Sequence, residues 1–236
     1  MANDDPLLIS TSAYRGLLTP EQLAEGMTAA NHNAARLLEG AELLAERTHW
    51  SSAAALAVFA IEETAKEEIL RALATWPAEA RTFWRAFTSH KDKGDLAAVA
   101  WAREDASVME LLVVTLASGL GVVGRGVEAV KWRALYVDCL ATNAGPLWWT
   151  PERMGAEDAQ AMLETARRVV RRRVVCAEEV RILIRHMVPV AGAPWDEVNR
   201  AHARYLREVV DEGLREKEPW MSTRLGFDPW AEGSRE

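Results

Sequence analysis

The hydrophobic residues of this chain recur mainly with the 3.6-residue period of an amphipathic α-helix. The clearest stripe follows the sequence TPEQ (19–22), which has the form of a capping box with proline in the first helical turn. It predicts a helix that runs to about Arg47, with one apolar face made by Leu23, Met27, Ala30, Ala34, Leu37, Ala41 and Leu44. Strand-like alternation is scarce, so the pattern predicts an all-α protein.

The same pattern predicts further helices along the chain, at about 51–75, 77–87, from 95 onward, 127–140, 156–187 and 194–217. We expect a polar loop at 89–95, and a turn at 143–146 that precedes an apolar plug, Leu147-Trp148-Trp149. No repeat or long linker divides the chain. We therefore expect one domain, with an N-terminal arm (1–18), a helical core (19–149) and a C-terminal helical extension packed on the core (150–236).

The second predicted helix carries charged residues within its apolar arc. At 100° per residue, Glu62, Glu63 and Lys66 fall between apolar residues of this arc, which are Leu56, Val58, Phe59, Ile69, Leu70 and Leu73. Buried charges are costly unless each is matched. Lys66 is spaced to pair with either glutamate, which leaves one negative charge over. We expect the rest of the fold to supply a cation, a metal, a shared proton or hydrogen-bond donors.

Composition narrows the classes of function. The formal net charge of −7 argues against general coating of nucleic acid, although it leaves room for a local basic site. Cys139 and Cys176 have no CxxC or Cys/His partner, so we expect no zinc cluster and a reducing compartment. The acidic start MANDDPLLIS predicts no signal peptide, and the longest apolar stretch (111–124) is shorter than the ~20 residues of a membrane span. We expect a cytoplasmic protein without a membrane partner.

Four segments in order resemble the AbiV family of bacterial abortive-infection proteins, within the HEPN superfamily. They are NAARLLEGAELL (33–44), ALAVFAIEETAKEEIL (55–70), FWRAFTSHKDK (83–93) and KWRALYVDC (131–139). The resemblance implies a HEPN-like antiparallel helical bundle with additional C-terminal helices, and a host protein that halts phage growth. It also implies a homodimer, with RNA, the translation machinery or a phage-encoded protein as partner.

Many HEPN proteins are metal-independent ribonucleases that use an arginine and a histidine at short spacing. The histidine takes the proton of the RNA 2′-hydroxyl, and the guanidinium stabilises the charge that develops on phosphorus. Two pairs here have this spacing, Arg85–His90 and Arg181–His186, and a chain rich in arginine produces such pairs by chance. We favour Arg85–His90 because His90 lies in a family-like segment, although the superfamily usually has a polar residue where Ala86 stands.

The catalytic hypothesis makes His90 the base and Arg85 the phosphate electrophile, with Glu63 and Lys66 in support. A carboxylate beside His90 would raise its pKa and fix its tautomer. The candidates for substrate contact are Lys93, Glu62, Asn33 and Asp138, and Lys93 would neutralise the remaining glutamate charge or contact a phosphate.

A structural alternative stays open, in which the charged residues form a buried, self-satisfied network that fixes helix register. A metal site built from Glu62, Glu63, His90 and Asp138 is disfavoured because Lys66 competes for the carboxylates. We assign no metal and no cofactor.

Three other motifs favour structural interpretations. Gly119-x-Gly121-x-x-Gly124 matches a dinucleotide fingerprint without the preceding strand, so it predicts helix packing or a bend. The basic run 167–173 is flanked by glutamates, which predicts a salt-bridged solvated face rather than phosphate contact. Trp148 and Trp149 are expected in the core or a dimer contact rather than as a base-stacking platform.

Three functions remain open on the sequence. The first is an antiphage effector that acts on RNA or blocks translation, as an endoribonuclease in its enzymatic form. The second is a non-enzymatic interaction protein that senses or sequesters a phage or host protein. The third is a nucleotide- or RNA-binding module without cleavage.

Overall fold

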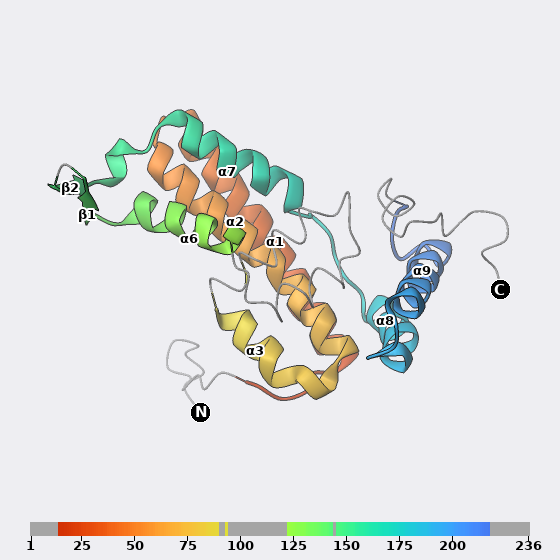
Figure 1. Ribbon diagram of the computed structural model, residues 1–236. Helices are drawn as coiled ribbons and strands as arrows, with labels where there is room; N and C mark the ends of the chain where they lie inside the picture. The colour runs from red at the N-terminus through yellow and green to blue at the C-terminus, as the bar shows by residue number, and fades with distance from the viewer. Residues whose placement is uncertain (1–13, 90–92, 94–121, 144, 218–236) are drawn as a thin grey trace, which may run out of the picture.

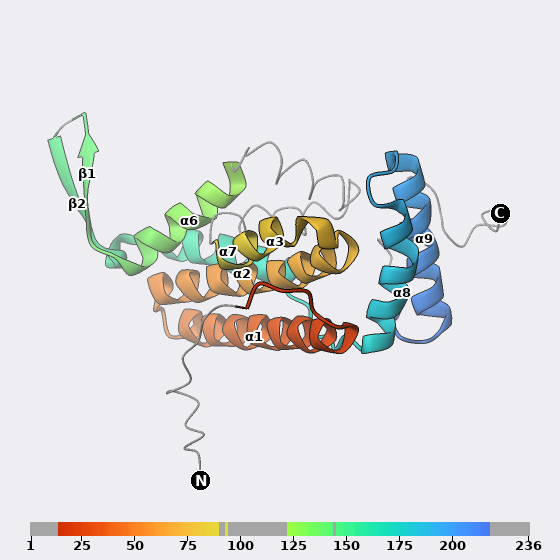
Figure 2. The same cartoon turned by 90° about the horizontal axis from the view of Figure 1, so that it is seen from below.

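The computed structural model describes residues 14–89, 93, 122–143 and 145–217. Two long helices, α1 (Pro20–Glu46) and α2 (Trp50–Thr75), lie antiparallel and side by side over their whole length (Figures 1 and 2). The predicted capping box is confirmed at the start of α1. The Gln22 amide donates to Thr19 Oγ1 over 3.3 Å, and the Thr19 amide donates to Gln22 Oε1 over 3.0 Å.

Small residues allow α1 and α2 to approach closely. A Cβ atom at Gly26 would lie 3.1 Å from Leu70 Cδ1, and one at Gly40 would lie 3.2 Å from Leu56 Cδ1. Both leucines therefore pack directly against the α1 backbone. Fully buried alanines fill the rest of the contact, among them Ala34, Ala41, Ala53, Ala57 and Ala60. Tight packing of this kind maximises dispersion contacts per unit length.

Helix α2 is the central element of the described fold. A 3₁₀ turn (Pro77–Glu79) leads into α3 (Ala80–Thr88), and α3, α6 (Val122–Leu135) and α7 (Ala156–Val169) all pack against α2. Because it is covered on several sides, α2 buries charged residues as well as apolar ones, including Glu62, Glu67 and Glu68. The expectation that charges enter the dry side of this helix is confirmed for Glu62, whereas Glu63 and Lys66 are only partly buried.

A β-hairpin replaces the end of the helix predicted at 127–140. Helix α6 ends at Leu135, and β1 (Asp138–Thr142) pairs antiparallel with β2 (Gly145–Trp149) in a register that places Asp138 opposite Trp149. The Trp149 indole N–H donates to the Arg133 carbonyl over 2.8 Å, which fastens the hairpin to the last turn of α6. Figure 2 shows the hairpin projecting from one end of the bundle. Cys139 therefore lies in a strand.

The helix predicted at 156–187 is two helices, α7 and α8 (Ala177–Met187), joined by an irregular segment at 170–176. Side chains of α1 hold this segment. Thr28 Oγ1 accepts the Val175 amide over 2.9 Å and donates to the Val175 carbonyl over 3.2 Å, and Asn31 Nδ2 donates to the Arg173 carbonyl over 3.4 Å. These bonds satisfy backbone groups that a continuous helix would have paired.

Helix α8 pairs with α9 (Trp195–Asp211) through a 3₁₀ turn (Val188–Val190), and both lie at the end of the bundle away from the hairpin (Figure 2). Helix α9 ends short of the predicted Lys217. Gly213 adopts a φ of 68°, and the Leu214 amide donates to the Val209 carbonyl over 2.9 Å, which closes the helix with a left-handed glycine.

Some predictions fall outside the described residues: most of the N-terminal arm, His90, the helix from 95 and the first glycines of the 119–126 stretch. At the end of the predicted polar loop, Lys93 is helical and its amide donates to the Ser89 carbonyl over 3.2 Å. The loop prediction is wrong at that position. None of the helices in the described ranges is long and apolar enough to cross a membrane.

Candidate functional site

Two lysines that are distant from Glu62 in the sequence form ion pairs with its carboxylate. Its side chain is 3% exposed, Lys131 Nζ of α6 donates to Oε1 over 2.7 Å, and Lys93 Nζ lies 3.9 Å from Oε2. The sequence had suggested Lys93 for this charge but missed the closer Lys131. A signal was present, because Lys131 opens the family-like segment KWRALYVDC.

Glu63 lies in a second, more accessible group of side chains. Lys66 Nζ lies 2.6 Å from Glu63 Oε1, and Asn33 Nδ2 of α1 donates to Oε2 over 3.0 Å. Arg36 in turn donates to Asn33 Oδ1 over 2.8 Å. The exposed fractions of the Glu63 and Lys66 side chains are 16% and 21%, so both are partly open to solvent. The structure therefore brings together three of the predicted site residues, Asn33, Glu63 and Lys66.

The two groups interact electrostatically, and we call them together the α2 charge cluster: Glu62, Glu63, Lys66, Lys93 and Lys131. Burial lowers the pKa of Lys93, while the charge of Glu62 opposes this and that of Lys66 adds to it. The cluster combines three lysines with two glutamates. Helix α2 alone contributes two glutamates and one lysine, which carry a net negative charge. The two lysines from outside the helix make the net charge of the cluster positive.

Aromatic rings border the α2 charge cluster. Lys66 Nζ lies 5.2 Å from the centre of the Phe87 ring of α3, and Lys131 Nζ lies 5.8 Å from that of Phe59. Such cation–π contacts are attractive, and the attraction is stronger where the lysine is partly removed from water. The contact between Lys66 and Phe87 also places the C-terminal end of α3 beside the cluster.

A second charged network joins α2 to the C-terminal extension. Arg71 and Arg173 each donate to both Glu67 Oε1 and Glu179 Oε1 over distances between 2.7 and 3.3 Å. Tyr205 of α9 donates to Glu179 over 2.9 Å. Burial raises the pKa of Glu179, but the two guanidinium groups outweigh this and lower it to about 2. Glu67 is shifted in the same direction for the same reasons.

This network corrects the prediction for the basic run 167–173. Arg173 is only 17% exposed and pairs inside the protein, so it does not belong to a solvated face. Arg167 fits the prediction, because it forms an exposed ion pair with Glu42 over 2.8 Å. The difference arises because the chain leaves the helix at Val169 and turns Arg173 toward α2.

Arg85 is not brought to the α2 charge cluster. It is exposed on α3, whereas Phe83 and Ala86 of the same helix are buried. Phe87, which faces Lys66, follows Arg85 by two residues and thus points about 200° away around the helix. His90 lies outside the described residues.

Two other candidates lie apart from the cluster as well. Asp138 is exposed at the start of β1, where Oδ1 accepts the Cys139 amide over 2.7 Å. The alternative pair diverges, since Arg181 forms ion pairs with Glu178 and Glu21, while His186 Nε2 lies 2.6 Å from Glu208 Oε2. In the part of the chain that the structure describes, no three His, Cys, Asp or Glu side chains gather as metal ligands.

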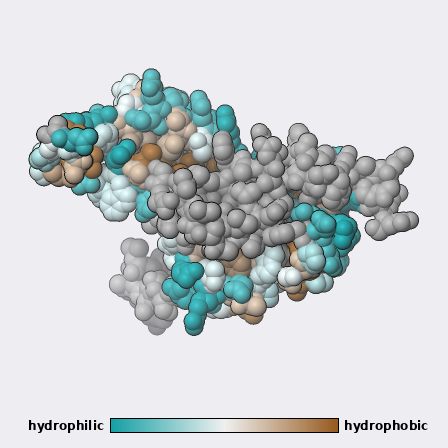
Figure 3. Space-filling view, viewed as in Figure 1, coloured by the Kyte–Doolittle hydropathy of each residue, from teal (hydrophilic) through white to brown (hydrophobic). Residues whose placement is uncertain are grey.

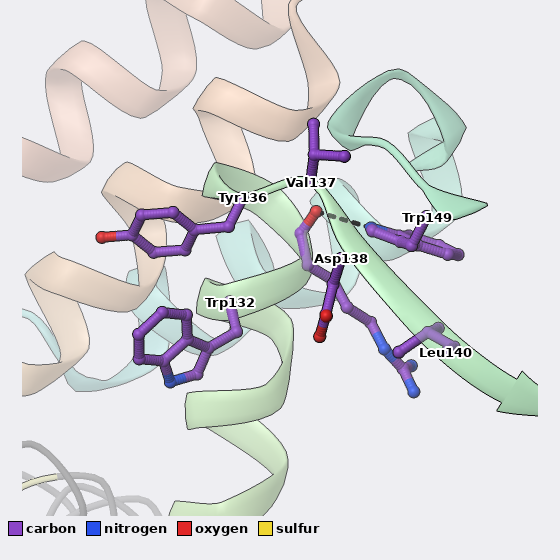
Figure 4. Close-up of a pocket in the computed structure, with 7 residues that line it drawn as sticks. Trp132, Tyr136, Val137, Asp138, Leu140 and Trp149 are labelled. Carbon is purple, nitrogen blue, oxygen red and sulfur yellow. Dashed lines mark hydrogen bonds between the residues drawn. The ribbon is translucent and has the colours of Figure 1, made fainter. Parts of the chain in front are cut away.

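A cavity of about 330 Å³ lies where α6 meets the hairpin (Figure 4). Its lining residues are Trp132, Arg133, Tyr136, Val137, Asp138, Leu140 and Trp149. The sequence reasoning missed this site, apart from Asp138. The available signal was the spacing of Trp132 and Tyr136, which places two aromatic side chains one helical turn apart.

Comparison with known protein families covers most of the helices described above, together with the α2 charge cluster and the cavity. A family model of the HEPN type, described as AbiV, matches residues 22–171. The chain belongs to the AbiV family. The match spans more than half of the chain and includes α1 to α7, the α2 charge cluster and the cavity, while α8 and α9 lie beyond it. The family resemblance and the helical fold class are confirmed. No curated protein and no solved structure matches the chain.

Proposed function

We propose that this AbiV-family protein is a cytoplasmic abortive-infection effector that stops phage growth by cleaving RNA. The observation that carries the proposal is the AbiV family match over residues 22–171. A homodimer that acts on RNA or the translation machinery is part of the same proposal. A molecular mass of twice 26.2 kDa in multi-angle light scattering would support the dimer.

In the proposed reaction, His90 removes the proton of a 2′-hydroxyl and Arg85 stabilises the charge on phosphorus. Arg85 suits this role because its guanidinium is exposed on α3 and forms no ion pair within the described ranges. Lys93, which follows His90 closely in sequence, is anchored near Glu62. Glu63 and Lys66 act as positioning residues, because Lys66 contacts Phe87 at the end of α3.

The test compares Arg85→Ala and His90→Ala with Arg81→Ala. Arg81 is also exposed on α3 and lies one turn before Arg85, so it is a matched control for loss of surface charge. Purified proteins are incubated with total RNA, with and without a chelator, and the same variants are scored for protection from phage. We expect the first two variants to lose cleavage and protection while keeping the melting temperature. Arg81→Ala should keep both, and retained protection in both Arg85→Ala and His90→Ala would overturn the mechanism.

A second candidate function, that of a non-enzymatic interaction protein, is favoured by the exposed aromatic side chains between the last turn of α6 and the hairpin. Trp132, Tyr136 and Trp148 are all more than half exposed. This function predicts no RNA cleavage with or without chelator, and protection that survives Arg85→Ala but is lost on Trp132→Ala. The two candidates therefore give opposite results in the same phage assay.

A further inference from the structure

Trp132 of α6 and Tyr136, which follows the last residue of that helix, form a paired, solvent-facing aromatic platform. The ring centres of Trp132 and Tyr136 are 4.6 Å apart with an angle of 38° between the planes, and their exposed fractions are 54% and 51%. Large aromatic residues gathered in the open mark a binding surface more often than chance exposure. In the space-filling view, the end of the molecule that carries the hairpin has a mixed surface, with residues coloured from teal to brown side by side (Figure 3).

The platform borders the cavity between α6 and the hairpin, which also contains polar groups. Figure 4 shows Trp132 and Tyr136 on one side of Asp138, and Trp149 and Leu140 on the other. Asp138 Oδ1 accepts the Cys139 amide, so the carboxylate is held in place with its second oxygen available as an acceptor. Arg133 contributes a guanidinium whose carbon lies 5.6 Å from the Trp149 ring centre.

We propose that this cavity binds one unpaired nucleobase together with its phosphate. The flat base stacks on the Trp132–Tyr136 platform. Asp138 accepts hydrogen bonds from N–H donors on the edge of the base, and Arg133 contacts the phosphate. The volume of about 330 Å³ is at the lower end of the ~300–1,000 Å³ typical of small-ligand pockets, which suits one nucleotide.

The charges of the cavity favour an unpaired base over a duplex. Among the described residues that line it, Arg133 is the one cation and Asp138 the one carboxylate. Duplex binding relies on many cations along the phosphate backbone, and a base inside a duplex has both faces stacked and its Watson–Crick edge bonded to its partner. Bases with an exocyclic amino group (guanine, adenine and cytosine) offer Asp138 a donor that uracil lacks.

This proposal does not depend on the proposed cleavage residues. Trp132 lies on α6, Tyr136 follows the end of that helix and Asp138 begins β1, whereas Arg85 lies on α3. To keep the two proposals distinguishable, binding is measured with labelled single-stranded oligonucleotides that have 2′-O-methyl riboses, which cannot undergo attack by a 2′-hydroxyl. Failure of RNA cleavage would then leave the binding measurement unaffected.

The test compares Trp132→Ala with Trp148→Ala by fluorescence anisotropy on the full chain. Trp148 is 65% exposed and neighbours Trp149 on β2 but does not line the cavity, so it is a matched control. Loss of one stacked base is expected to weaken binding about 5- to 100-fold in Trp132→Ala. Trp132→Phe should restore most of it, and Trp148→Ala should stay close to the unaltered protein. Asp138→Asn should reduce the preference for amino-bearing bases over uracil.

Two further arms identify the source of the nucleotide and the outcomes that overturn the proposal. Competition by guanosine monophosphate at concentrations similar to those of the oligonucleotide indicates a free nucleotide, and competition by the strand alone indicates single-stranded RNA. Equal losses in Trp132→Ala and Trp148→Ala, or duplex binding as tight as single-strand binding, would refute the assignment. A change of oligomeric mass in Trp132→Ala with unchanged RNA binding would make the platform a protein contact instead.

Discussion

Lys131 Nζ donates to Glu62 Oε1 over 2.7 Å, although 69 positions separate the two residues and both side chains are buried. This ion pair fixes α6 against the middle of α2. The arrangement carries a general cost, because an ion pair is taken out of water and the loss of one member leaves the charge of the other less well matched. Lys131 is therefore the residue whose loss should affect the core most clearly.

We expect Lys131→Met to lower the free energy of unfolding by about 3–5 kcal/mol, because Glu62 is left buried with Lys93 as a partner at 3.9 Å. Urea denaturation measures the change. The control is Arg167→Ala, which breaks the exposed pair with Glu42 and should cost less than about 1 kcal/mol. The double variant Glu62→Leu/Lys131→Met should recover part of the loss, since both members of the closest pair are removed, while Lys93 stays buried without Glu62. A loss in Lys131→Met as small as that in Arg167→Ala would contradict a buried pair.

Glu63→Ala should be milder than Lys131→Met, with a loss of about 1–3 kcal/mol. Lys66 is 21% exposed and can turn toward water when its partner is removed, whereas Asn33 loses an acceptor. The same urea experiment compares the two variants directly. A loss in Glu63→Ala that equals or exceeds that in Lys131→Met would show that the Asn33–Glu63–Lys66 group is mainly a scaffold.

Thr28→Val should loosen the segment at 170–176. The substitution keeps the shape of the side chain but removes the oxygen that accepts the Val175 amide, at a cost of about 1–3 kcal/mol. Hydrogen exchange should accelerate at residues 170–176 and stay unchanged in the middle of α1. Thr165→Val is the control, because the Thr165 hydroxyl donates to the Ala161 carbonyl of its own helix in a solvent-exposed hydrogen bond and is not bonded to the segment at 170–176 within the described residues. Equal protection of the segment in Thr28→Val would refute its anchoring to α1.

Acid should destabilise the protein through Glu179. Its pKa is lowered to about 2 in the folded state against an ordinary value of 4.5, because Arg71 and Arg173 outweigh the effect of burial. A depressed carboxyl pKa stabilises the fold above the unfolded value, and this contribution is lost as pH falls from about 4.5 toward 2. The shift corresponds to about 3 kcal/mol.

Urea midpoints between pH 6 and pH 2 measure this dependence, and the curve of Glu179→Gln should be flatter below pH 4.5 although that variant is less stable throughout. Glu67, whose pKa is lowered in the same network, keeps some acid dependence in that variant. Parallel curves for the two proteins would exclude Glu179 as a source of acid sensitivity.

Local signals in the sequence predicted the elements whose stabilising contacts are close along the chain. The capping box of α1 joins residues three positions apart, and the Glu63–Lys66 pair lies within one helical turn. Both were predicted because their geometry follows from helical periodicity. The hairpin was not, since the Trp149 bond to the Arg133 carbonyl depends on the hairpin folding back on α6.

The same distinction between local contacts and contacts made only on folding applies to the candidate site. Helical spacing placed Glu62 on the dry side of α2 and required a counter-charge, but it gave no means of choosing between Lys93 and Lys131. The aromatic cavity was missed because its walls come from a helix and two strands that meet only after folding. Arg85 was predicted as a site residue from its spacing to His90. In the structure, Phe83 and Ala86 pack inward, and this leaves Arg85 on the exposed side of α3.

The sequence by itself determined the helical class, the family, the start of α1 and the presence of charge inside α2, because each of these follows from short-range periodicity or from segments read in order. Tertiary structure alone decided where α7 ends and which cations neutralise Glu62. Val169 is followed by residues that a helix would accept, yet Thr28 and Asn31 hold them extended. Buried charges and backbone groups that a helix leaves unpaired bind the partners that packing brings close to them. For the segment after α7, those partners lie more than a hundred residues away in the sequence.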